Sequence, residues 1–235
     1  MSKIFICGDV HGGEDYGLRK LTSSKFPEGK ELTKDDYVII AGDFGCIWDV
    51  NESKKQEAYN LKWLASKPWT TLFIDGNHEN FDRLNSLPTK QMFNGTVGVV
   101  NDSIYHLKRG EVYTINGKTF FTFGGATSVD KNQRREFISW WKEEIPNIKE
   151  IQHGLVNLAK VENKVDYVIT HTCPGKIFYY SLPGFSEKNA DPTYKILNMF
   201  YDLIDYKHWY FGHFHIDKNI DKKFTILYNK VREIK

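Results

Sequence analysis

Five polar clusters, each directly after a short apolar run, constrain this sequence more than any other feature. The apolar runs are rich in β-branched and aromatic residues, which predicts strands. The predicted strands are residues 3–7, 37–40, 71–74, 119–123, 165–169 and 208–211. The clusters are Gly8-Asp9-Val10-His11-Gly12, Gly42-Asp43, Gly76-Asn77-His78-Glu79, Thr170-His171 and Gly212-His213-Phe214-His215. Because ligand sites of open α/β sheets lie outside the carboxyl ends of strands, we predict that all five converge on one rim.

Segments in which apolar residues have helical spacing lie between several of the predicted strands. The helical segments are residues 18–21, 59–64, 137–141, 148–158 and 194–204. Strands that alternate with helices predict an α/β domain. Residues 97–123 depart from this alternation, because the turn signals Asn101-Asp102 and Asn116-Gly117 predict consecutive, partly antiparallel strands. Residues 172–192 are rich in proline, glycine and aromatics and predict a long loop, which in a compact domain is often functional.

Length and charge favour one domain without a general affinity for polyanions. The 235 residues are 40% hydrophobic, enough to fill one core, and no repeat or linker divides them. We therefore predict a single domain over residues 1–235. The 32 basic and 30 acidic residues leave a formal charge of +2, so any contact with nucleic acid must come from a local site.

Cysteine usage and the N-terminal sequence favour a cytoplasmic chain. Cys7, Cys46 and Cys173 are odd in number, widely spaced and without a CxxC pair, which fits reduced thiols better than disulfides or a zinc ribbon. The N-terminus lacks the signal-peptide pattern, and no run of about 20 apolar residues occurs. We expect no membrane partner, and nothing in the sequence indicates an oligomeric state.

The polar residues of the clusters have the chemistry of a site for two metal ions. Side chains two apart on an extended backbone point the same way, so Asp9 with His11, and His213 with His215, can each face one cavity. The candidate ligands are Asp9, His11, Asp43, Asn77, His171, His213 and His215. Imidazole with carboxylate or amide oxygen suits divalent transition metals, with manganese first and iron, zinc, nickel or cobalt as alternatives. Seven ligands suit two ions that share a carboxylate, a centre suited to in-line displacement at phosphorus.

The motifs GDVHG, GD, GNHE, a lone strand-end histidine and GHFH resemble the calcineurin-like metallophosphoesterase superfamily over residues 8–215. The resemblance implies a four-layer α/β/β/α sandwich of two mixed sheets flanked by helices. It also implies hydrolysis of phosphomonoesters or phosphodiesters by metal-activated hydroxide.

Residue roles follow from the same resemblance. Asp9, His11 and His215 would hold one ion, and Asn77, His171 and His213 the other, with Asp43 bridging the two. His78 would contact the phosphate beside Asn77 and aid protonation of the leaving group. Glu79 is expected to orient His78.

One motif departs from the pattern of many phosphomonoesterases in the superfamily. They continue the second motif as GDxxDRG, whereas this chain reads GDFGCIW, with Cys46 and Ile47 where the aspartate and arginine would stand. Another cation would have to contact the substrate phosphate, and the candidates are Arg83, Arg134 and Arg135. A phosphodiester carries one charge fewer, so the missing arginine favours diester substrates.

Alternative functions on the same fold remain open. Phe178, Tyr179 and Tyr180 lie in the predicted loop after His171, where stacking on a base would suit a nuclease or nucleotide-end phosphatase. A protein serine/threonine phosphatase is less compatible, because the arginine motif is missing and Thr172-Cys173-Pro174 follows His171. A non-catalytic scaffold is disfavoured by the complete ligand set.

Other conspicuous residues have simpler explanations. We expect His106, His153 and His208 to be surface or core histidines, and Trp140 with Trp141 to pack within a helix.

Overall fold

Two mixed β-sheets lie face to face in the computed structural model, which describes residues 2–50, 54–181 and 191–235. The first sheet, in the order β13-β1-β2-β3-β6-β5-β4, consists of β1 (Ile4–Cys7), β2 (Tyr37–Ala41), β3 (Thr70–Ile74), β4 (Thr89–Met92), β5 (Gly95–Asn101), β6 (Ile104–Leu107) and β13 (Arg232–Glu233). The second sheet, in the order β11-β12-β10-β9-β8-β7, consists of β7 (Glu111–Ile115), β8 (Lys118–Phe123), β9 (Lys164–Thr170), β10 (Asp205–Phe211), β11 (Lys218–Asn219) and β12 (Phe224–Ile226).

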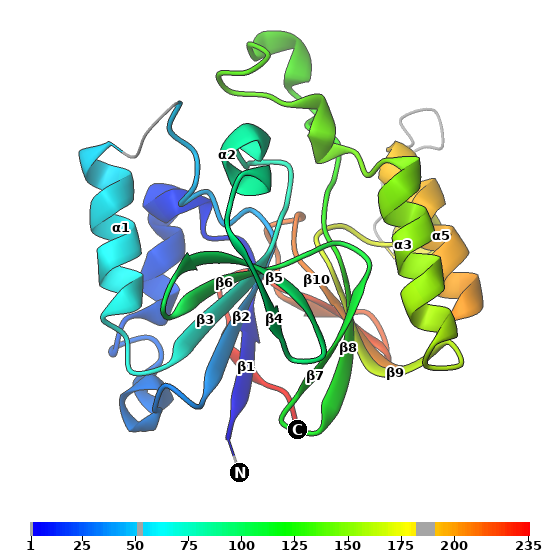
Figure 1. Ribbon diagram of the computed structural model, residues 1–235, viewed down its shortest axis with the longest axis horizontal. Coiled ribbons are helices and arrows are strands. Elements are labelled where there is room, and N and C mark those ends of the chain that lie inside the picture. Colours follow the sequence, from blue (N-terminus) through cyan, green and yellow to red (C-terminus); the bar gives the residue numbers. More distant parts are fainter. Residues whose placement is uncertain (1, 51–53, 182–190) are drawn as a thin grey trace.

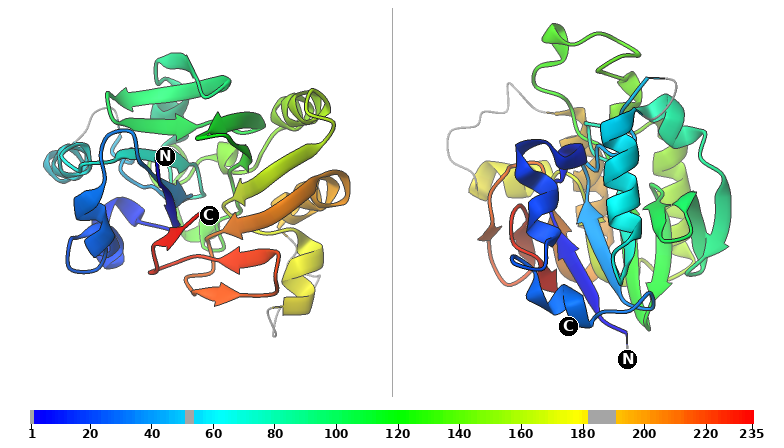
Figure 2. Two further views of the ribbon diagram at one scale, coloured as in Figure 1. Left: turned by 90° about the horizontal axis from the view of Figure 1, so that it is seen from below. Right: turned by 90° about the vertical axis from the view of Figure 1, so that its left-hand side faces the viewer.

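Helices cover the outer faces of the two sheets (Figures 1 and 2). On the side of the first sheet are η1 (His11–Leu21), η2 (Pro27–Glu31), α1 (Lys55–Ala65) and α2 (Phe81–Asn85). On the side of the second are α3 (Ile148–Ala159), α4 (Gly175–Ser181) and α5 (Pro192–Leu203). Two short 3-10 turns, η3 (Lys131–Gln133) and η4 (Lys142–Glu144), lie between β8 and α3. The predicted four-layer α/β/β/α sandwich is therefore confirmed.

Alternating side chains of the central strands build the layers. In β1, Ile4 and Ile6 pack between the two sheets, whereas Phe5 and Cys7 pack against the outer helices. In β8, Phe120 faces the other sheet and Phe121 faces the outer helices. Strands covered on both faces need apolar residues at every position, which explains why the sequence shows continuous apolar runs.

The chain switches from one sheet to the other within the segment of consecutive strands. β5 pairs antiparallel with β6 in the first sheet, and β7 pairs antiparallel with β8 in the second. Asn116 and Gly117 both have positive φ, 50° and 74°, as a two-residue hairpin turn with the right twist requires. The predicted antiparallel strands are confirmed, and their four strands divide equally between the sheets.

Helix boundaries agree with the sequence where capping residues set them. α3 begins at a capping box in which Asn147 accepts from Glu150 N and the Glu150 side chain accepts from Asn147 N. α5 begins with Pro192 after Asp191, whose side chain accepts from Thr193 N.

Three predicted segments differ from the structure. The helix predicted at 137–141 is wrong: Phe137 has φ 60°, and its amide donates to the Trp140 carbonyl in a tight loop. Trp141 is buried but lies outside any helix, and its indole N–H donates to Asp82. The loop predicted at 172–192 contains α4, while residues 182–190 lie outside the described part. The predicted helix at 18–21 belongs to the 3-10 helix η1.

Among the described residues, no helix has both the length and the apolar character needed to cross a bilayer.

A buried ion pair lies directly before the GNHE motif. Arg109 donates from Nε to Asp75 Oδ2 over 2.8 Å, and both side chains are at most 5% exposed. Burial opposes ionisation of Asp75, but Arg109 and His106 outweigh it and lower the pKa of this carboxyl to about 2. Because this folded-state pKa is depressed, the resulting stabilisation is present above about pH 4 and is lost as the pH falls toward 2.

We predict that Arg109→Ala lowers the free energy of unfolding by about 3 to 5 kcal/mol, because the buried Asp75 carboxylate loses the guanidinium that compensates its charge. Urea denaturation at neutral pH measures this loss. Lys164→Ala is the matched control, since its pair with Asp205 is 76% and 71% exposed and should contribute less than about 1 kcal/mol. Equal losses in both variants would contradict the prediction.

Candidate metal centre

The polar clusters meet at one rim, where parallel strands of both sheets end (Figure 1). The residues in question are Asp9 and His11 after β1, Asp43 after β2, Asn77 and His78 after β3, His171 after β9, and His213 and His215 after β10. Backbone hydrogen bonds join the clusters directly. The amides of Val10 and His11 donate to the Asp43 carbonyl over 3.0 and 2.8 Å, and the Gly212 amide donates to the His171 carbonyl over 2.9 Å.

One group of donors lies around His11. One ligand atom from each of Asp9, His11, Asp43 and His215 falls within 4.8 Å of all the others, which makes this a candidate metal site. The Nε2 atoms of His11 and His215 are 3.0 Å apart, and His215 Nε2 is 3.2 Å from Asp9 Oδ2. Two imidazole nitrogens that each lie about 2.1 Å from the same ion, with an angle of about 90° between them at the ion, would be about 3 Å apart. The donor types and their spacing therefore fit a divalent transition-metal ion.

A second group of donors lies around His171 and shares Asp43 with the first. His171 Nε2 is 3.2 Å from both Asp43 Oδ1 and Asn77 Oδ1, and the His213 ring lies 5.0 Å from the His171 ring. Asp43 Oδ2 points the other way and is 3.8 Å from His11 Nε2. The two oxygens of one carboxylate thus face the two groups.

The charges of the centre favour a cation at each group. Burial opposes ionisation of Asp9 and Asp43, yet contacts with His215 and His171 hold the pKa of both carboxyls below the ordinary value. Burial would lower the pKa of His171, but the Asp43 carboxylate raises it to about 10. Burial and the neighbouring His171 lower the pKa of His213 to about 4, which leaves its ring neutral and able to act as a ligand.

Strained backbone positions aim the ligands. His11, Asp43, His213 and His215 have φ of 45°, 46°, 68° and 51°, in the left-handed region that non-glycine residues rarely adopt. Such conformations cost of order 1 to 3 kcal/mol each and concentrate at functional sites, where surrounding contacts hold them.

The glycines of the motifs make room for ligands from other motifs. A Cβ on Gly42 would overlap the His171 ring, one on Gly76 would overlap the Asp43 carboxylate, and one on Gly212 would overlap Asp9. The sequence interpretation assigned these glycines to turns and close approach, and the structure shows which side chains approach.

A hydrogen-bond chain that the sequence did not reveal orients Asn77. Asn77 Nδ2 donates to Ser128 Oγ over 3.2 Å, and Ser128 Oγ donates to Glu144 Oε2 over 2.6 Å. The Ser128 amide donates to the other oxygen of Glu144 over 2.9 Å. Since the amide nitrogen of Asn77 is committed to Ser128, its Oδ1 faces His171.

Three further contacts brace the ligands. His171 Nδ1 donates to the Ala41 carbonyl over 3.0 Å, which presents Nε2 to the centre. The ring of Tyr228 stacks on His215 at 4.7 Å and 10°. Lys20, 4% exposed, donates to the Asp9 carbonyl over 2.6 Å and lies under Tyr228. No local pattern marks these residues, because their roles depend on contacts across the fold.

Glu79 does not orient His78 as the sequence predicted. Its two oxygens accept from the backbone amides of Phe44 and Gly45 over 2.7 and 3.2 Å. Glu79 therefore holds the turn that carries Asp43, which explains why it lies within GNHE. His78 instead donates its backbone amide to Asp43 Oδ1 over 2.8 Å.

The three candidate arginines occupy different surroundings. Arg134 Nη2 lies 3.3 Å from both ring nitrogens of His78, and its Nε donates to Asp130. Arg83 instead donates to both oxygens of Glu57, over 2.6 and 2.9 Å. Arg135 is exposed. Arg134 is thus the arginine that the structure brings to His78.

The remaining predicted positions are in the protein interior or in structural contacts. Cys46 and Ile47, which replace the arginine motif, are 0% and 2% exposed, so these positions face the core. Phe178 is buried in α4 against Tyr194 and Phe214, which contradicts a stacking surface there. The side chain of Tyr180 lies outside the described residues, and Tyr179 packs against Phe178.

The three histidines set aside in the sequence make structural contacts, as expected. His106 contacts Asp75, His153 contacts Glu111, and His208 contacts Thr225.

The fold and the donor geometry define a protein of the metallophosphoesterase class. Residues 2–217 match the family described as calcineurin-like phosphoesterase, and the chain belongs to this family.

Comparisons with individual proteins find distant relatives. A lariat debranching enzyme of Danio rerio is 24% identical over 76% of this chain and 32% of that protein. One of Entamoeba histolytica is 23% identical over 93% of this chain and 65% of that protein. The chain thus spans less than two thirds of the length of these relatives. The crystal structure of a phosphopantetheinyl hydrolase from Mycobacterium tuberculosis aligns at TM-score 0.49 and 14% identity, over 99% of this chain and 95% of that one.

We predict that Ser128→Ala weakens binding of one metal ion by about 10- to 100-fold, because the Asn77 amide loses the acceptor that orients it. Titration calorimetry of the apoprotein with Mn²⁺ measures the effect. Ser128→Thr keeps the hydroxyl and should bind nearly as well. Ser86→Ala, at an exposed serine whose hydroxyl contacts only the Arg83 carbonyl, is the distant control. Unchanged affinity in Ser128→Ala would show that Asn77 is oriented by other contacts.

Proposed function

We propose that this chain is a phosphoester hydrolase that works with two divalent transition-metal ions, manganese being the first candidate. The observation that carries the proposal is the Asp43 carboxylate, whose two oxygens face two separate groups of imidazole and oxygen donors. Asp9, His11 and His215 would hold one ion, Asn77, His171 and His213 the other, and Asp43 both. When bound, such a pair activates water for attack on phosphorus and neutralises charge in the transition state.

In this proposal His78 serves the leaving group. Its ring lies 5.0 Å from the His11 ring, at the edge of the centre. Burial first, and then the positive charge of Arg134, lower the pKa of His78, so the ring is neutral near pH 7. A neutral imidazole retains one N–H, which can donate to the oxygen that leaves phosphorus.

In this proposal Arg134 binds a phosphate oxygen beside His78. Its Nε is committed to Asp130 and its Nη1 to the Ser139 carbonyl, whereas Nη2 points to the His78 ring. Both contacts hold the guanidinium in one orientation. The segment between β8 and α3 therefore supplies a cation beside His78.

A nucleic-acid phosphodiester is the substrate class we propose. The lariat debranching relatives support it. In the described part of the chain one guanidinium, that of Arg134, faces His78, which suits a diester because a diester carries less charge than a monoester. A nucleotide-end phosphatase is the second candidate.

Cys7, Cys46 and Cys173 are buried and unpaired, in keeping with the expected cytoplasmic compartment.

Hydrolysis of aryl monoesters and aryl diesters by the Mn²⁺-loaded protein tests this substrate class. We expect faster turnover of the diester. Preference for monoesters by a wide margin would favour the nucleotide-end phosphatase, and absence of hydrolysis with both ions bound would favour a scaffold.

We predict that His78→Ala keeps both metal ions but lowers kcat by about 10²- to 10⁴-fold, because only proton donation is lost. Asp43→Asn should lose bound metal as well as activity, since one carboxylate faces both groups of donors. Metal analysis together with steady-state kinetics separates the two variants. Full metal occupancy in Asp43→Asn would contradict the bridging assignment.

Arg134→Ala should lower kcat/KM by about 100-fold at unchanged stability and metal content, as expected when one donor to the transition state is removed. Arg83→Ala is the comparison, because Arg83 contacts Glu57 and its loss should reduce the free energy of unfolding instead. Kinetics and urea denaturation of both variants check the assignment. A larger catalytic loss in Arg83→Ala would make Arg83 the phosphate ligand.

A further inference from the structure

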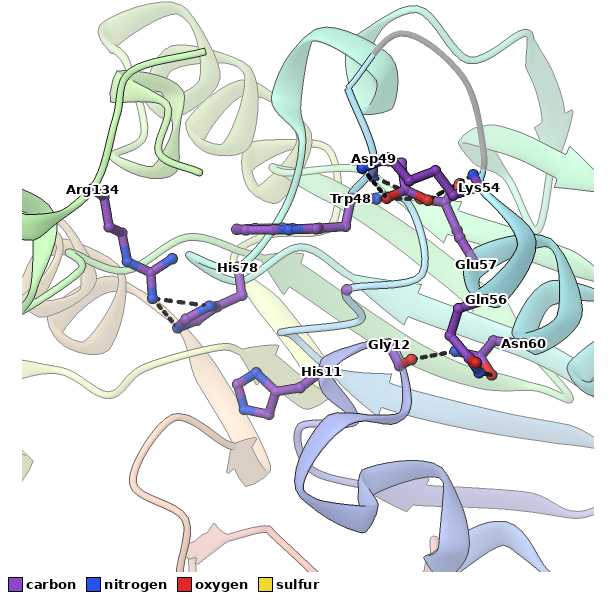
Figure 3. Close-up of a pocket in the computed structure, with 11 residues that line it drawn as sticks. His11, Gly12, Trp48, Asp49, Lys54, Gln56, Glu57, Asn60, His78 and Arg134 are labelled. Atoms are coloured by element: carbon purple, nitrogen blue, oxygen red, sulfur yellow. Dashed lines mark hydrogen bonds and ion pairs between the residues drawn. The ribbon is translucent and has the colours of Figure 1, made fainter. Parts of the chain in front are cut away.

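A cavity of about 340 Å³ adjoins the candidate metal centre on the side of α1. His11 and His78 line it next to the centre, and Arg134 lies at the same end (Figure 3). Trp48 lies along one side, Gly12 along the other, and Gln56 at the far end. A group esterified to a phosphate beside His78 could extend directly into this space.

The two long sides of the cavity suit a flat ring. The Trp48 indole is half-buried and lies at 30° to the His78 ring, with 6.0 Å between centroids. Trp141 packs edge-on against it at 5.8 Å, and the Trp48 amide donates to Glu57 over 2.8 Å. The indole is thereby held in one orientation. Gly12, on the opposite side, leaves backbone rather than a side chain facing it.

Polar groups close the far end. Asn60 donates to the Gly12 carbonyl and accepts from Gln56 Nε2 over 3.0 Å. This arrangement fixes the amide of Gln56 and leaves its carbonyl oxygen, which accepts no hydrogen bond within the described residues, for an incoming N–H donor. Lys54, which also lines the cavity, is exposed and lies 3.7 Å from the carboxylate of Asp49, so these two charges balance each other.

We propose that this cavity, the Trp48 slot, binds the base of a nucleotide whose phosphate lies at the metal centre. An aromatic face, an open backbone opposite it and an amide at the end match the face and the hydrogen-bonding edge of a nucleobase. The proposal rests on the phosphoesterase function above and adds what the esterified group is. It assigns the stacking role to Trp48, in place of the aromatic residues after His171.

The test compares adenosine 5′-monophosphate with ribose 5-phosphate, which lacks the base, as competitive inhibitors of aryl-ester hydrolysis by the Mn²⁺-loaded protein. We expect the nucleotide to bind about 10- to 100-fold more tightly, as base–aromatic stacking allows. Trp48→Leu should remove most of this ratio and Trp48→Phe should keep most of it. Tyr59→Leu is the matched control, because Tyr59 lies on α1 and is 62% exposed outside the slot.

Equal inhibition by the two compounds in the wild-type protein, or an unchanged ratio in Trp48→Leu, would overturn the proposal while leaving the phosphoesterase function intact. If Trp48→Leu does not fold, Gln56→Ala replaces it, because Gln56 is exposed and its loss should lower the ratio several-fold. Failure of the wild-type protein to hydrolyse any aryl ester would instead contradict the proposed function. In that case, calorimetric titration of the protein with the two compounds would test directly whether the Trp48 slot binds the base, and equal affinities would overturn the slot proposal.

Discussion

Asp43, in the turn after β2, contacts three other parts of the chain that are distant from it in sequence. The carbonyl accepts from the turn after β1, Oδ1 accepts from the His78 amide, and the same oxygen faces His171 from the other sheet. Asp43 makes these contacts from a left-handed conformation that Glu79 supports by binding the next two amides. Displacement of this one residue would separate the two groups of donors, so the chemistry of the proposed centre depends on it.

Charge balance explains why such a centre can be buried. Isolated carboxylates in the interior cost free energy unless they are paired or bind cations. Here Asp9 and Asp43 are compensated by imidazoles, and the raised pKa of His171 shows how strongly the centre favours positive charge. Next to the centre, Asp75 is compensated by Arg109. Divalent ions would supply the same compensation in the proposed working state and release the imidazoles to act as neutral ligands.

Segments outside the sheets carry the residues that we propose to contact the substrate. The piece of chain between β8 and α3 projects beyond the rim in Figure 1 and carries both Ser128, which orients Asn77, and Arg134, which reaches His78. The loop after β2 carries Trp48 into the adjoining cavity. A rigid rim of strand ends with variable segments around it is the usual arrangement by which one fold serves several substrates.

Six of the strands, the α/β class and the candidate ligands could be predicted from the amino-acid sequence, because apolar runs and the polar residues that follow them are local patterns. Its resemblance to a known family added the two-sheet architecture. The sequence did not show that residues 137–141 form a loop, since Trp141 is buried through its contact with Asp82 on α2 rather than on a helical face of its own. Other contacts are visible only in the folded protein. Glu79 binds the turn that carries Asp43, and Ser128 and Glu144 orient Asn77. Arg134, rather than Arg83, faces His78. Each of these depends on which side chains meet across the fold, and no spacing along the chain encodes such meetings.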